Sequence, residues 1–250
     1  MPSPALTALA ARLRSARRTT ILTGAGVSAA SGVPTFRGRD GLWKQQRPED
    51  LATPEAFERD PDAVWEWYAW RRARVAACAP NPAHEVIARW SRQHPAWRVL
   101  TQNVDDLHVR AGTVHLTRLH GSIWELSCAA GCAAGCTPWR DLAADDATPR
   151  SCPHCGARAR PAVVWFGEAL DGATLADARA ATHCDLFLTV GTSAVVYPAA
   201  GFVHEAQRHG AFTAEINPDE TPASGVVDLA IAAPAELVLP EVDRLLEREH

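Results

Sequence analysis

The chain of 250 residues has no apolar run that approaches the roughly 20 residues needed to cross a bilayer. Its first residues, MPSPALTALAARLRSARR, place the arginines after the apolar residues and contain no long apolar core, which argues against a secretory signal. Positive charge is not in excess either, since the formal net charge is -4 and the pI is near 6.2. We therefore expect neither insertion into a membrane nor direct binding of nucleic acid.

Cysteine is scarce and unevenly placed. Of the 7 cysteines, most fall within the short stretch from Cys128 to Cys155, whereas Cys78 and Cys184 stand alone. Disulfide-rich secreted scaffolds spread their cysteines more evenly through shorter chains. Clustered pairs without a signal peptide favour metal ligation in a reducing compartment, so we expect a cytoplasmic protein. Cys78 and Cys184 are interpreted as small buried hydrophobic side chains.

Short β-branched runs alternate with helical patterns, and each run ends in small or polar residues. The expected strands are residues 19–23, 98–101, 185–190 and 211–216. This alternation predicts an α/β fold, a Rossmann-like doubly wound parallel sheet with helices on both faces. In such sheets the ligand lies beyond the carboxyl ends of the strands, where the polar residues occur. Leu6, Leu9 and Leu13 recur at helical spacing and predict an amphipathic first helix.

Two segments interrupt the alternation. One, up to Cys78, contains no convincing strand and is rich in tryptophan, arginine and proline; the other contains the cysteine cluster and a short exposed loop at residues 143–149. We expect them to form a smaller helical and zinc-binding domain. The predicted division is a nucleotide-binding domain of residues 1–37, 80–120 and 168–250, and a small domain of residues 38–79 and 121–167.

A glycine-rich turn follows the first expected strand. Gly24, Ala25 and Gly26, with Ala29 where a third glycine is often replaced by alanine, are typical of a dinucleotide-binding turn. Small residues there let backbone N–H groups approach a pyrophosphate at the amino terminus of a helix. A tight turn without a ligand is the alternative. The acidic residue usually found about 20 positions later is not evident, which disfavours an ordinary dehydrogenase.

The cysteines give an independent signal. Cys152 and Cys155 enclose a tight Cys-x-x-Cys knuckle, and Cys128 forms a second pair with either Cys132 or Cys136. Four thiolates in this arrangement suit a closed tetrahedral zinc site, which is structural because it leaves no open position for catalysis. Such an ion would stabilise a small domain that lacks a core of its own. Free thiols without a metal remain the alternative.

Several sequence blocks stand out along nearly the whole chain: GAGVSAASGVPTFRG at 24–38, GLW at 41–43, TQNVDDLH at 101–108, LHGS at 119–122, VVWFGE at 163–168, GTSAVVYP at 191–198, INP at 216–218, and Ala235. In wording and order these blocks resemble the sirtuin (Sir2) family. The resemblance implies that NAD is a co-substrate and that no hydride is transferred. Since the family's first cysteine pair is closely spaced, the expected zinc ligands are Cys128, Cys132, Cys152 and Cys155, with Cys136 as the alternative second ligand.

The resemblance also implies which residues contact NAD. The first loop would hold the phosphates and close over the nicotinamide ribose, the Gln-Asn-x-Asp block would contact ribose hydroxyls and the nicotinamide carboxamide, and the later blocks would line the adenosine half. The residues so assigned are Gly24, Ala25, Gly26, Ser28, Thr35, Phe36, Arg37, Trp43, Gln102, Asn103, Asp105, Gly191, Thr192, Ser193, Asn217 and Ala235.

His120 is the candidate general base. An imidazole titrates near neutral pH and can accept a ribose hydroxyl proton without prior activation. In the mechanism that the resemblance implies, the acyl-lysine carbonyl oxygen attacks the ribose carbon as nicotinamide leaves. His120 then activates a ribose hydroxyl that attacks the resulting imidate. The products would be free lysine, nicotinamide and O-acyl-ADP-ribose.

Tyr68 and Arg71 lie three residues apart, on one face of an expected helix. A guanidinium can grip a carboxylate with two hydrogen bonds, so the pair can select an acidic acyl group. It resembles the Tyr-x-x-Arg element of class III sirtuins, which remove succinyl and malonyl groups as well as acetyl. The alternative is that Trp65, Tyr68 and Arg72 pack while Arg71 is solvated.

Residues 163–168 resemble the family's substrate loop. We expect an extended segment there on which an acyl-lysine protein or peptide pairs as an added strand, with contacts from Val164 and Phe166.

Three other functions compete with a class III deacylase. The same fold can serve a deacetylase or an ADP-ribosyltransferase without preference for acidic acyl groups. A non-catalytic module that binds NAD or ADP-ribose is possible, and so is a redox enzyme that uses the Cys-x-x-Cys motif, although five clustered cysteines disfavour it.

Overall fold

The computed structural model describes residues 3–35, 47–135, 137–144 and 148–247. The larger of its two sheets consists of six parallel strands. The strand order is β3-β2-β1-β7-β8-β9, and the bounds in that order are Leu116–Arg118, Arg98–Thr101, Thr19–Thr23, Leu186–Val190, Phe212–Ile216 and Leu229–Ile231. The chain runs from β1 outward to β3 and returns to β7 on the other side of β1. The order therefore reverses between β1 and β7, and the predicted doubly wound α/β fold is confirmed.

The predicted strands agree closely with the observed ones. β1 and β2 have the predicted bounds, whereas β7 and β8 each begin one residue later than predicted. β9 was not predicted, because its three residues are too few to show a periodic pattern.

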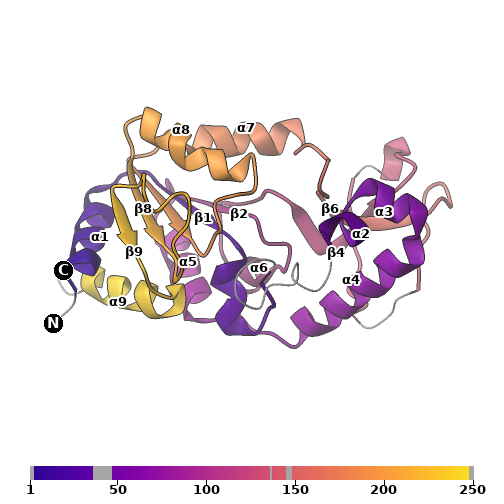
Figure 1. Ribbon diagram of the computed structural model, residues 1–250, viewed down its shortest axis with the longest axis horizontal. Coiled ribbons are helices and arrows are strands. Elements are labelled where there is room, and N and C mark those ends of the chain that lie inside the picture. Colours follow the sequence, from indigo (N-terminus) through magenta and orange to yellow (C-terminus); the bar gives the residue numbers. More distant parts are fainter. Residues whose placement is uncertain (1–2, 36–46, 136, 145–147, 248–250) are drawn as a thin grey trace.

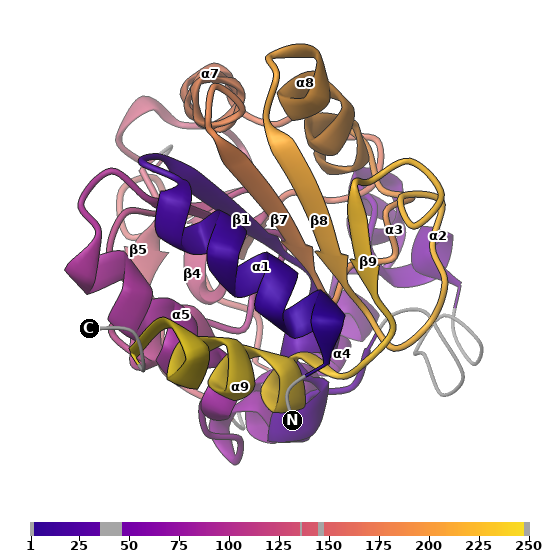
Figure 2. The ribbon, with the colours of Figure 1, turned by 90° about the vertical axis from the view of Figure 1, so that its left-hand side faces the viewer.

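Helices cover both faces of this sheet (Figure 2). On one face lie α1 (Pro4–Ser15), α5 (Pro82–Gln93) and α9 (Ala235–Glu247), and on the other lie α7 (Gly172–Ala181) and α8 (Phe202–Arg208). Each face has its own hydrophobic core, and the buried side chains of Leu6, Leu9 and Leu13 belong to the first. The predicted amphipathic first helix is thus confirmed. Ser3 accepts a hydrogen bond from the N–H of Leu6 and caps its amino terminus.

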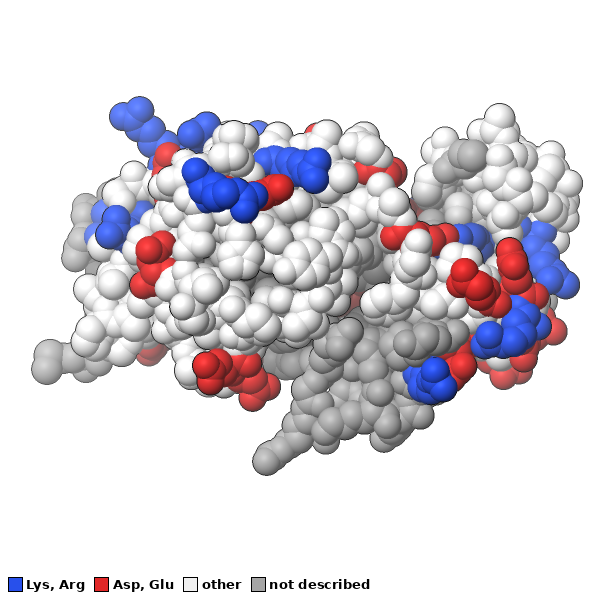
Figure 3. Space-filling model, turned by 45° about the horizontal axis from the view of Figure 1, so that its top comes forward, with Lys and Arg blue, Asp and Glu red and all other residues white. Residues whose placement is uncertain are grey.

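A smaller antiparallel sheet and three helices lie at the other end of the molecule (Figure 1). The sheet order is β5-β4-β6, with bounds Trp139–Arg140, Gly121–Cys128 and Ala159–Val163. The helices are α2 (Pro48–Leu51), α3 (Pro54–Arg59) and α4 (Pro61–Ala76). They share a tryptophan-rich core with the small sheet, to which Trp65, Trp124 and Trp165 contribute. A recess separates this part from the larger one, and charges of both signs are interspersed on the face that Figure 3 presents.

Ion pairs join the small sheet to its surroundings. The Arg72 side chain of α4 is 1% exposed; its Nε donates to the carbonyl oxygen of Ile123 at 2.6 Å and its Nη1 to Asp141 at 2.8 Å. Asp106, which follows β2 and has a left-handed φ of 61°, accepts from Arg140 of β5 at 2.8 Å. The end of β2 is therefore connected to the small sheet by charge-assisted hydrogen bonds.

The remaining helical elements are short. They are the 3₁₀ helices η1 (Ala25–Ser31), η3 (Ala133–Gly135) and η4 (Ala199–Gly201), and the single α-helical turn α6 (Leu107–Arg110). Among the helices that the structure describes, none combines the length and the apolar character that a bilayer crossing requires.

Two buried histidines lie against each other behind the turn that follows β1. The rings of His84 and His108 are 4.8 Å apart. Nδ1 of His84 accepts from the N–H of Asn81, and Nε2 of His108 lies 3.0 Å from the hydroxyl of Thr23. Burial lowers the pKa of His84 to about 4, and burial together with the neighbouring His84 lowers the pKa of His108 to about 3. Both imidazoles are therefore neutral at neutral pH.

This pair predicts that acid destabilises the fold well before the carboxylates titrate. Because each folded pKa lies below the unfolded value of about 6.5, the unfolded chain binds more protons, and stability is lost as the pH falls below 6.5. Each histidine should lower the free energy of unfolding by about 2 kcal/mol between pH 7 and pH 5. Urea unfolding at pH 7 and pH 5 measures how much the free energy of unfolding falls between the two pH values. This fall should be about 2 kcal/mol smaller for His108→Gln than for the wild type. Exposed His115→Asn should keep the wild-type loss, and an equal loss in all three proteins would contradict the assignment.

Candidate active site

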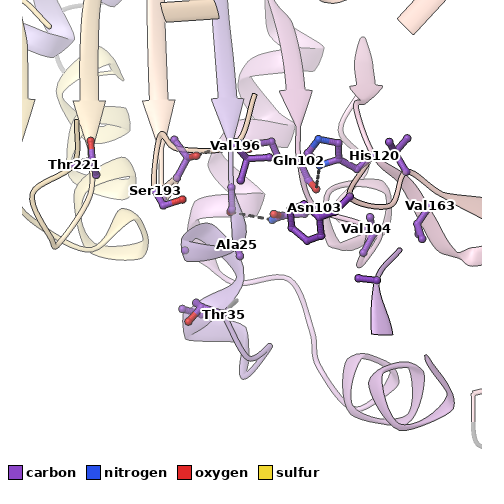
Figure 4. A pocket seen from close by; sticks show the side chains of 18 of the residues that line it. Ala25, Thr35, Gln102, Asn103, Val104, His120, Val163, Ser193, Val196 and Thr221 are labelled. Atoms are coloured by element: carbon purple, nitrogen blue, oxygen red, sulfur yellow. Dashed lines mark hydrogen bonds between the residues drawn. The ribbon is translucent and has the colours of Figure 1, made fainter. Parts of the chain in front are cut away.

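A cavity of about 710 Å³ opens at the carboxyl ends of the strands. Its walls come from the turns after β1, β2, β7 and β8, from α4, and from the segment after β6 (Figure 4). The cavity thus spans the point between β1 and β7 where the strand order reverses, which is where open α/β sheets bind their ligands. In Figure 4, Ser193 and Thr221 lie toward one end of the pocket, and His120 and Val163 lie toward the other.

The turn after β1 is packed directly on the turn after β7. The N–H of Gly24 donates to Val190 at 3.0 Å, and the N–H of Gly26 donates to Gly191 at 2.8 Å. Gly191 has a φ of +59°, and a Cβ there would lie 2.4 Å from the backbone nitrogen of Val27. These amides therefore hold the two turns together and are not directed at a ligand. The turn leads into a 3₁₀ helix, not the α-helix that the dinucleotide pattern favours.

Two of the residues expected to contact NAD lie behind the wall. Ser28 and Asp105 are 0% and 5% exposed and do not line the cavity, as far as the described residues define it. The hydroxyl of Ser28 donates to Asp105 at 2.8 Å and accepts from the amide of Asn103 at 3.2 Å. The Asn103 amide also donates to the carbonyl of Gly24 at 3.0 Å. Burial raises the pKa of Asp105, and the N–H of Leu107 opposes this shift.

The other expected NAD contacts that the structure describes line the cavity. They are Gly24, Ala25, Gly26, Thr35, Gln102, Asn103, Gly191, Thr192, Ser193, Asn217 and Ala235. The Gln102 amide donates to the hydroxyl of Thr192 at 2.9 Å and so links the turns after β2 and β7. Phe36, Arg37 and Trp43, also expected to contact NAD, lie outside the described residues.

His120 lies in the cavity wall, two residues after the end of β3. The end of the neighbouring strand, β2, lies beside it. Its Nδ1 is 3.0 Å from the carbonyl oxygen of Gln102. Because a carbonyl only accepts, Nδ1 must carry the hydrogen, and Nε2 is left as the acceptor. Burial lowers the pKa of His120, although its hydrogen bond to Gln102 opposes the shift. At neutral pH the ring is thus a neutral base with a defined tautomer.

Tyr68 and Arg71, both on α4, line the same cavity. Tyr68 is 2% exposed, and the guanidinium carbon of Arg71 lies 5.3 Å from the Tyr68 ring and 4.8 Å from the Trp67 ring. Burial lowers the pKa of Arg71, and the neighbouring Tyr68 and Asp105 oppose this shift. Trp65, Tyr68 and Arg72 are buried, as the alternative expected, whereas Arg71 is half-buried and lines the cavity.

Val164 and Phe166 also line the cavity, but their segment is not extended throughout. β6 ends at Val163, and a turn follows in which the N–H of Glu168 donates to Trp165 at 3.1 Å and Gly167 has a φ of +88°. The carboxylate of Glu168 closes this turn, because it accepts from the N–H of Trp165 at 2.8 Å. The prediction of an extended segment from 163 to 168 is thus correct only as far as the end of β6.

Trp165 is a cavity residue that had no predicted role. Its indole Nε1 donates to the hydroxyl oxygen of Tyr68 at 2.9 Å, and it is 3% exposed. The two residues are 97 positions apart, so no local pattern could have revealed the contact. Ala52, Trp67 and Val104 also line this end of the cavity and were not predicted as site residues.

Four cysteines of the small sheet and its loops converge on one point. The Sγ atoms of Cys128, Cys132, Cys152 and Cys155 all lie within 4.8 Å of one another. The distances from Cys128 to Cys155 and from Cys132 to Cys152 are 3.5 and 3.7 Å. A tetrahedral zinc ion with Zn–S bonds of about 2.3 Å requires separations of about 3.8 Å, so the group fits one zinc ion. Cys136 lies outside the described residues.

The two isolated cysteines are both buried, at 8% exposure for Cys78 and 6% for Cys184. Burial raises the pKa of both thiols, that of Cys184 to about 11. The interpretation of these residues as small hydrophobic side chains is confirmed.

Gly135 provides a test of the metal site. A Cβ there would lie 2.6 Å from the Cβ of Cys128 and 2.7 Å from the Sγ of Cys132, so the ligands must shift. Gly135→Ala should therefore lower the zinc content per chain and speed the release of zinc to a chelator. Gly172→Ala, where a Cβ meets no atom within 4 Å, should match the wild type in both measurements. Full zinc content and unchanged release in Gly135→Ala would rule out the proposed ligand cluster.

Comparison with known proteins gives a consistent result. The sequence model of the Sir2 family matches residues 24–198. NAD-dependent protein deacylase 1 of Pseudomonas aeruginosa is 48% identical over 242 residues, which cover 93% of this chain and 95% of that protein. The solved complex of a Sir2 homologue with NAD is similar, with a TM-score of 0.89, 40% identity, and coverage of 97% of this chain and 94% of that one. A Sir2 protein bound to a myristoylated histone peptide has a TM-score of 0.79, 31% identity, and coverage of 98% and 97%.

Proposed function

The chain belongs to the Sir2 family and is an NAD-dependent protein deacylase, and we propose that it removes succinyl and malonyl groups from protein lysines as well as acetyl groups. NAD is the co-substrate, and one zinc ion is held by the four clustered cysteines. The proposed products are the free lysine, nicotinamide and O-acyl-ADP-ribose, with one water consumed.

One observation favours acidic acyl groups most strongly. Arg71 and Tyr68 lie side by side in the cavity wall, in surroundings made largely of tryptophan and small apolar residues. A guanidinium remains charged even when burial lowers its pKa, and it binds a carboxylate with two parallel hydrogen bonds. In a partly dehydrated pocket these bonds are stronger than in water. The end of the pocket therefore suits an acyl chain that terminates in a carboxylate.

His120 is proposed as the general base. Its Nδ1 hydrogen is engaged by the carbonyl of Gln102, which leaves Nε2 to accept a proton from a ribose hydroxyl. The two ends of the cavity then have separate tasks. The turns after β1, β7 and β8 hold the nucleotide, and α4 and the turn after β6 hold the acyl-lysine. Because both substrates share one cavity of about 710 Å³, the ribose and the acyl group can meet beside the imidazole.

The substrates are proposed to be acyl-lysine proteins or peptides. The similar Sir2 protein that binds a myristoylated histone peptide supports this class of partner. Main-chain pairing with the segment around Val164 and Phe166 would tolerate many sequences. We also propose that the protein is cytoplasmic, since its zinc cysteines must stay reduced.

The domain division is a further proposal. Residues 38–79 and 121–167 would form a small domain, because α2–α4 and the antiparallel sheet share one hydrophobic core. The remaining residues would form the nucleotide-binding domain.

The direct test incubates the purified protein with NAD and a succinyl-lysine peptide and follows both nicotinamide and the peptide mass. We expect nicotinamide release together with loss of the succinyl group from the peptide. A peptide that gains the mass of ADP-ribose would instead indicate an ADP-ribosyltransferase. Binding of NAD without nicotinamide release would indicate a non-catalytic module.

Arg71→Met should separate acidic from neutral acyl groups. Loss of the charge-assisted hydrogen bonds to the carboxylate should lower kcat/KM for a succinyl-lysine peptide about 100-fold, while the value for an acetyl-lysine peptide changes only a few-fold. Arg74→Met removes an exposed arginine from the same helix and should leave both values unchanged. If Arg71→Met reduced both substrates equally, no carboxylate clamp would be present.

The base has its own pH signature. Since burial lowers the pKa of His120, the midpoint of the acidic limb of kcat/KM, where the imidazole gains a proton, should lie below pH 6.5. His120→Ala should lose activity about 10²- to 10⁴-fold and still quench tryptophan fluorescence on binding NAD. An acidic limb centred above pH 6.5, or an active alanine variant, would refute this role.

A further inference from the structure

The Trp165 ring contacts an aromatic ring and a guanidinium. It packs on Phe57 with centroids 5.3 Å apart, and the guanidinium of Arg160 lies over it at 3.5 Å from the ring centroid. Arg160 is itself fixed by Glu168, through hydrogen bonds of 2.5 and 2.8 Å. The same carboxylate accepts from the backbone N–H of Trp165. The direction of the indole N–H is therefore set by the contacts of Trp165 with Phe57, Arg160 and Glu168.

The polarity of the contact with Tyr68 follows from chemistry. An indole nitrogen can only donate, so the hydroxyl oxygen of Tyr68 must accept at its distance of 2.9 Å. The hydroxyl hydrogen of Tyr68 then cannot point at Trp165. Burial raises the pKa of Tyr68, which therefore keeps this hydrogen at neutral pH. Since Tyr68 lines the cavity, the hydrogen is available to a ligand there.

We infer that Trp165 is a specificity-determining positioning residue, which turns the hydroxyl hydrogen of Tyr68 into the acyl pocket beside Arg71. The inference rests on the proposed removal of acidic acyl groups. With the hydroxyl so oriented, Tyr68 and Arg71 both act as donors, and a carboxylate is the chemical group that accepts from both.

The same orientation disfavours neutral acyl chains of equal length. A butyryl group has the length of a succinyl group without its carboxylate, so it leaves the buried Tyr68 donor without an acceptor. An unsatisfied buried donor costs about 1–3 kcal/mol. Trp165 therefore contributes to selectivity twice, by strengthening the contact with carboxylates and by penalising chains that lack one.

The test measures kcat/KM for matched succinyl-lysine and butyryl-lysine peptides in four proteins: wild type, Trp165→Phe, Tyr68→Phe and the double variant. Trp165→Phe removes the N–H and keeps an aromatic ring. We expect each single variant to lower the succinyl-to-butyryl ratio about 10-fold, the effect of one hydrogen bond to a charged group. The double variant should be no worse than either single variant, because both act through the same hydroxyl.

Two controls separate positioning from damage to the fold. Trp70→Phe removes the indole N–H of an exposed tryptophan that is not among the described residues lining the cavity, and it should keep the wild-type ratio. If Trp165→Phe folds poorly, incorporation of benzothienylalanine at position 165 replaces only the N–H by sulfur and should lower the ratio in the same way.

The outcomes also separate this inference from the proposed function. A wild-type protein that does not remove succinyl groups, or an Arg71→Met variant that removes them normally, refutes the proposed function. If both proteins behave as expected, the inference is overturned when Trp165→Phe keeps the wild-type succinyl-to-butyryl ratio because kcat/KM is unchanged or falls equally for both peptides. It is also overturned when the reductions of this ratio by Trp165→Phe and Tyr68→Phe multiply in the double variant.

Discussion

The packing of the turn after β1 on the turn after β7 is the constraint on which the site depends. The hydrogen bond from Gly26 to Gly191 joins these turns at the point where the strand order reverses, and the space between them admits no side chain. Asn103 adds a third turn by donating to the carbonyl of Gly24. The floor of the proposed nucleotide end is therefore a set of hydrogen-bonded backbone and amide groups, with Ala25 facing the cavity. Elements fixed in this way preorganise a site before its ligand arrives.

The proposed acyl end is assembled differently, from the small sheet and α4. Its proposed selectivity depends on the relative position of α4 and the turn after β6, and the contact between Tyr68 and Trp165 connects these two elements. Arg72 joins α4 to β4, and the cysteine cluster lies at the far end of the same small sheet. The proposed zinc ion thus acts at a distance from the chemistry, by stabilising the sheet that holds one wall of the cavity.

Much of this could be predicted from sequence, and the limits have physical causes. β1 and β2 were predicted correctly, since they are short runs rich in β-branched and apolar residues that end in small or polar residues. The cysteine cluster was also predicted, because ligand spacing is a local property. The burial of Ser28 and Asp105 behind the wall was not, because it depends on how the turns pack. The turn at Gly167 and the donor role of Trp165 were missed for the same reason, since each is fixed by residues distant in sequence.

The central claim is that one cavity brings a ribose carbon and an acylated lysine together beside a single neutral imidazole. A crystal structure of the protein with NAD and a succinyl-lysine peptide tests it most directly. We predict Nε2 of His120 within about 3 Å of a ribose hydroxyl, the hydrogen-bond distance that proton transfer requires. A ribose bound beyond reach of His120, or an acyl group directed away from the cavity, would contradict the account.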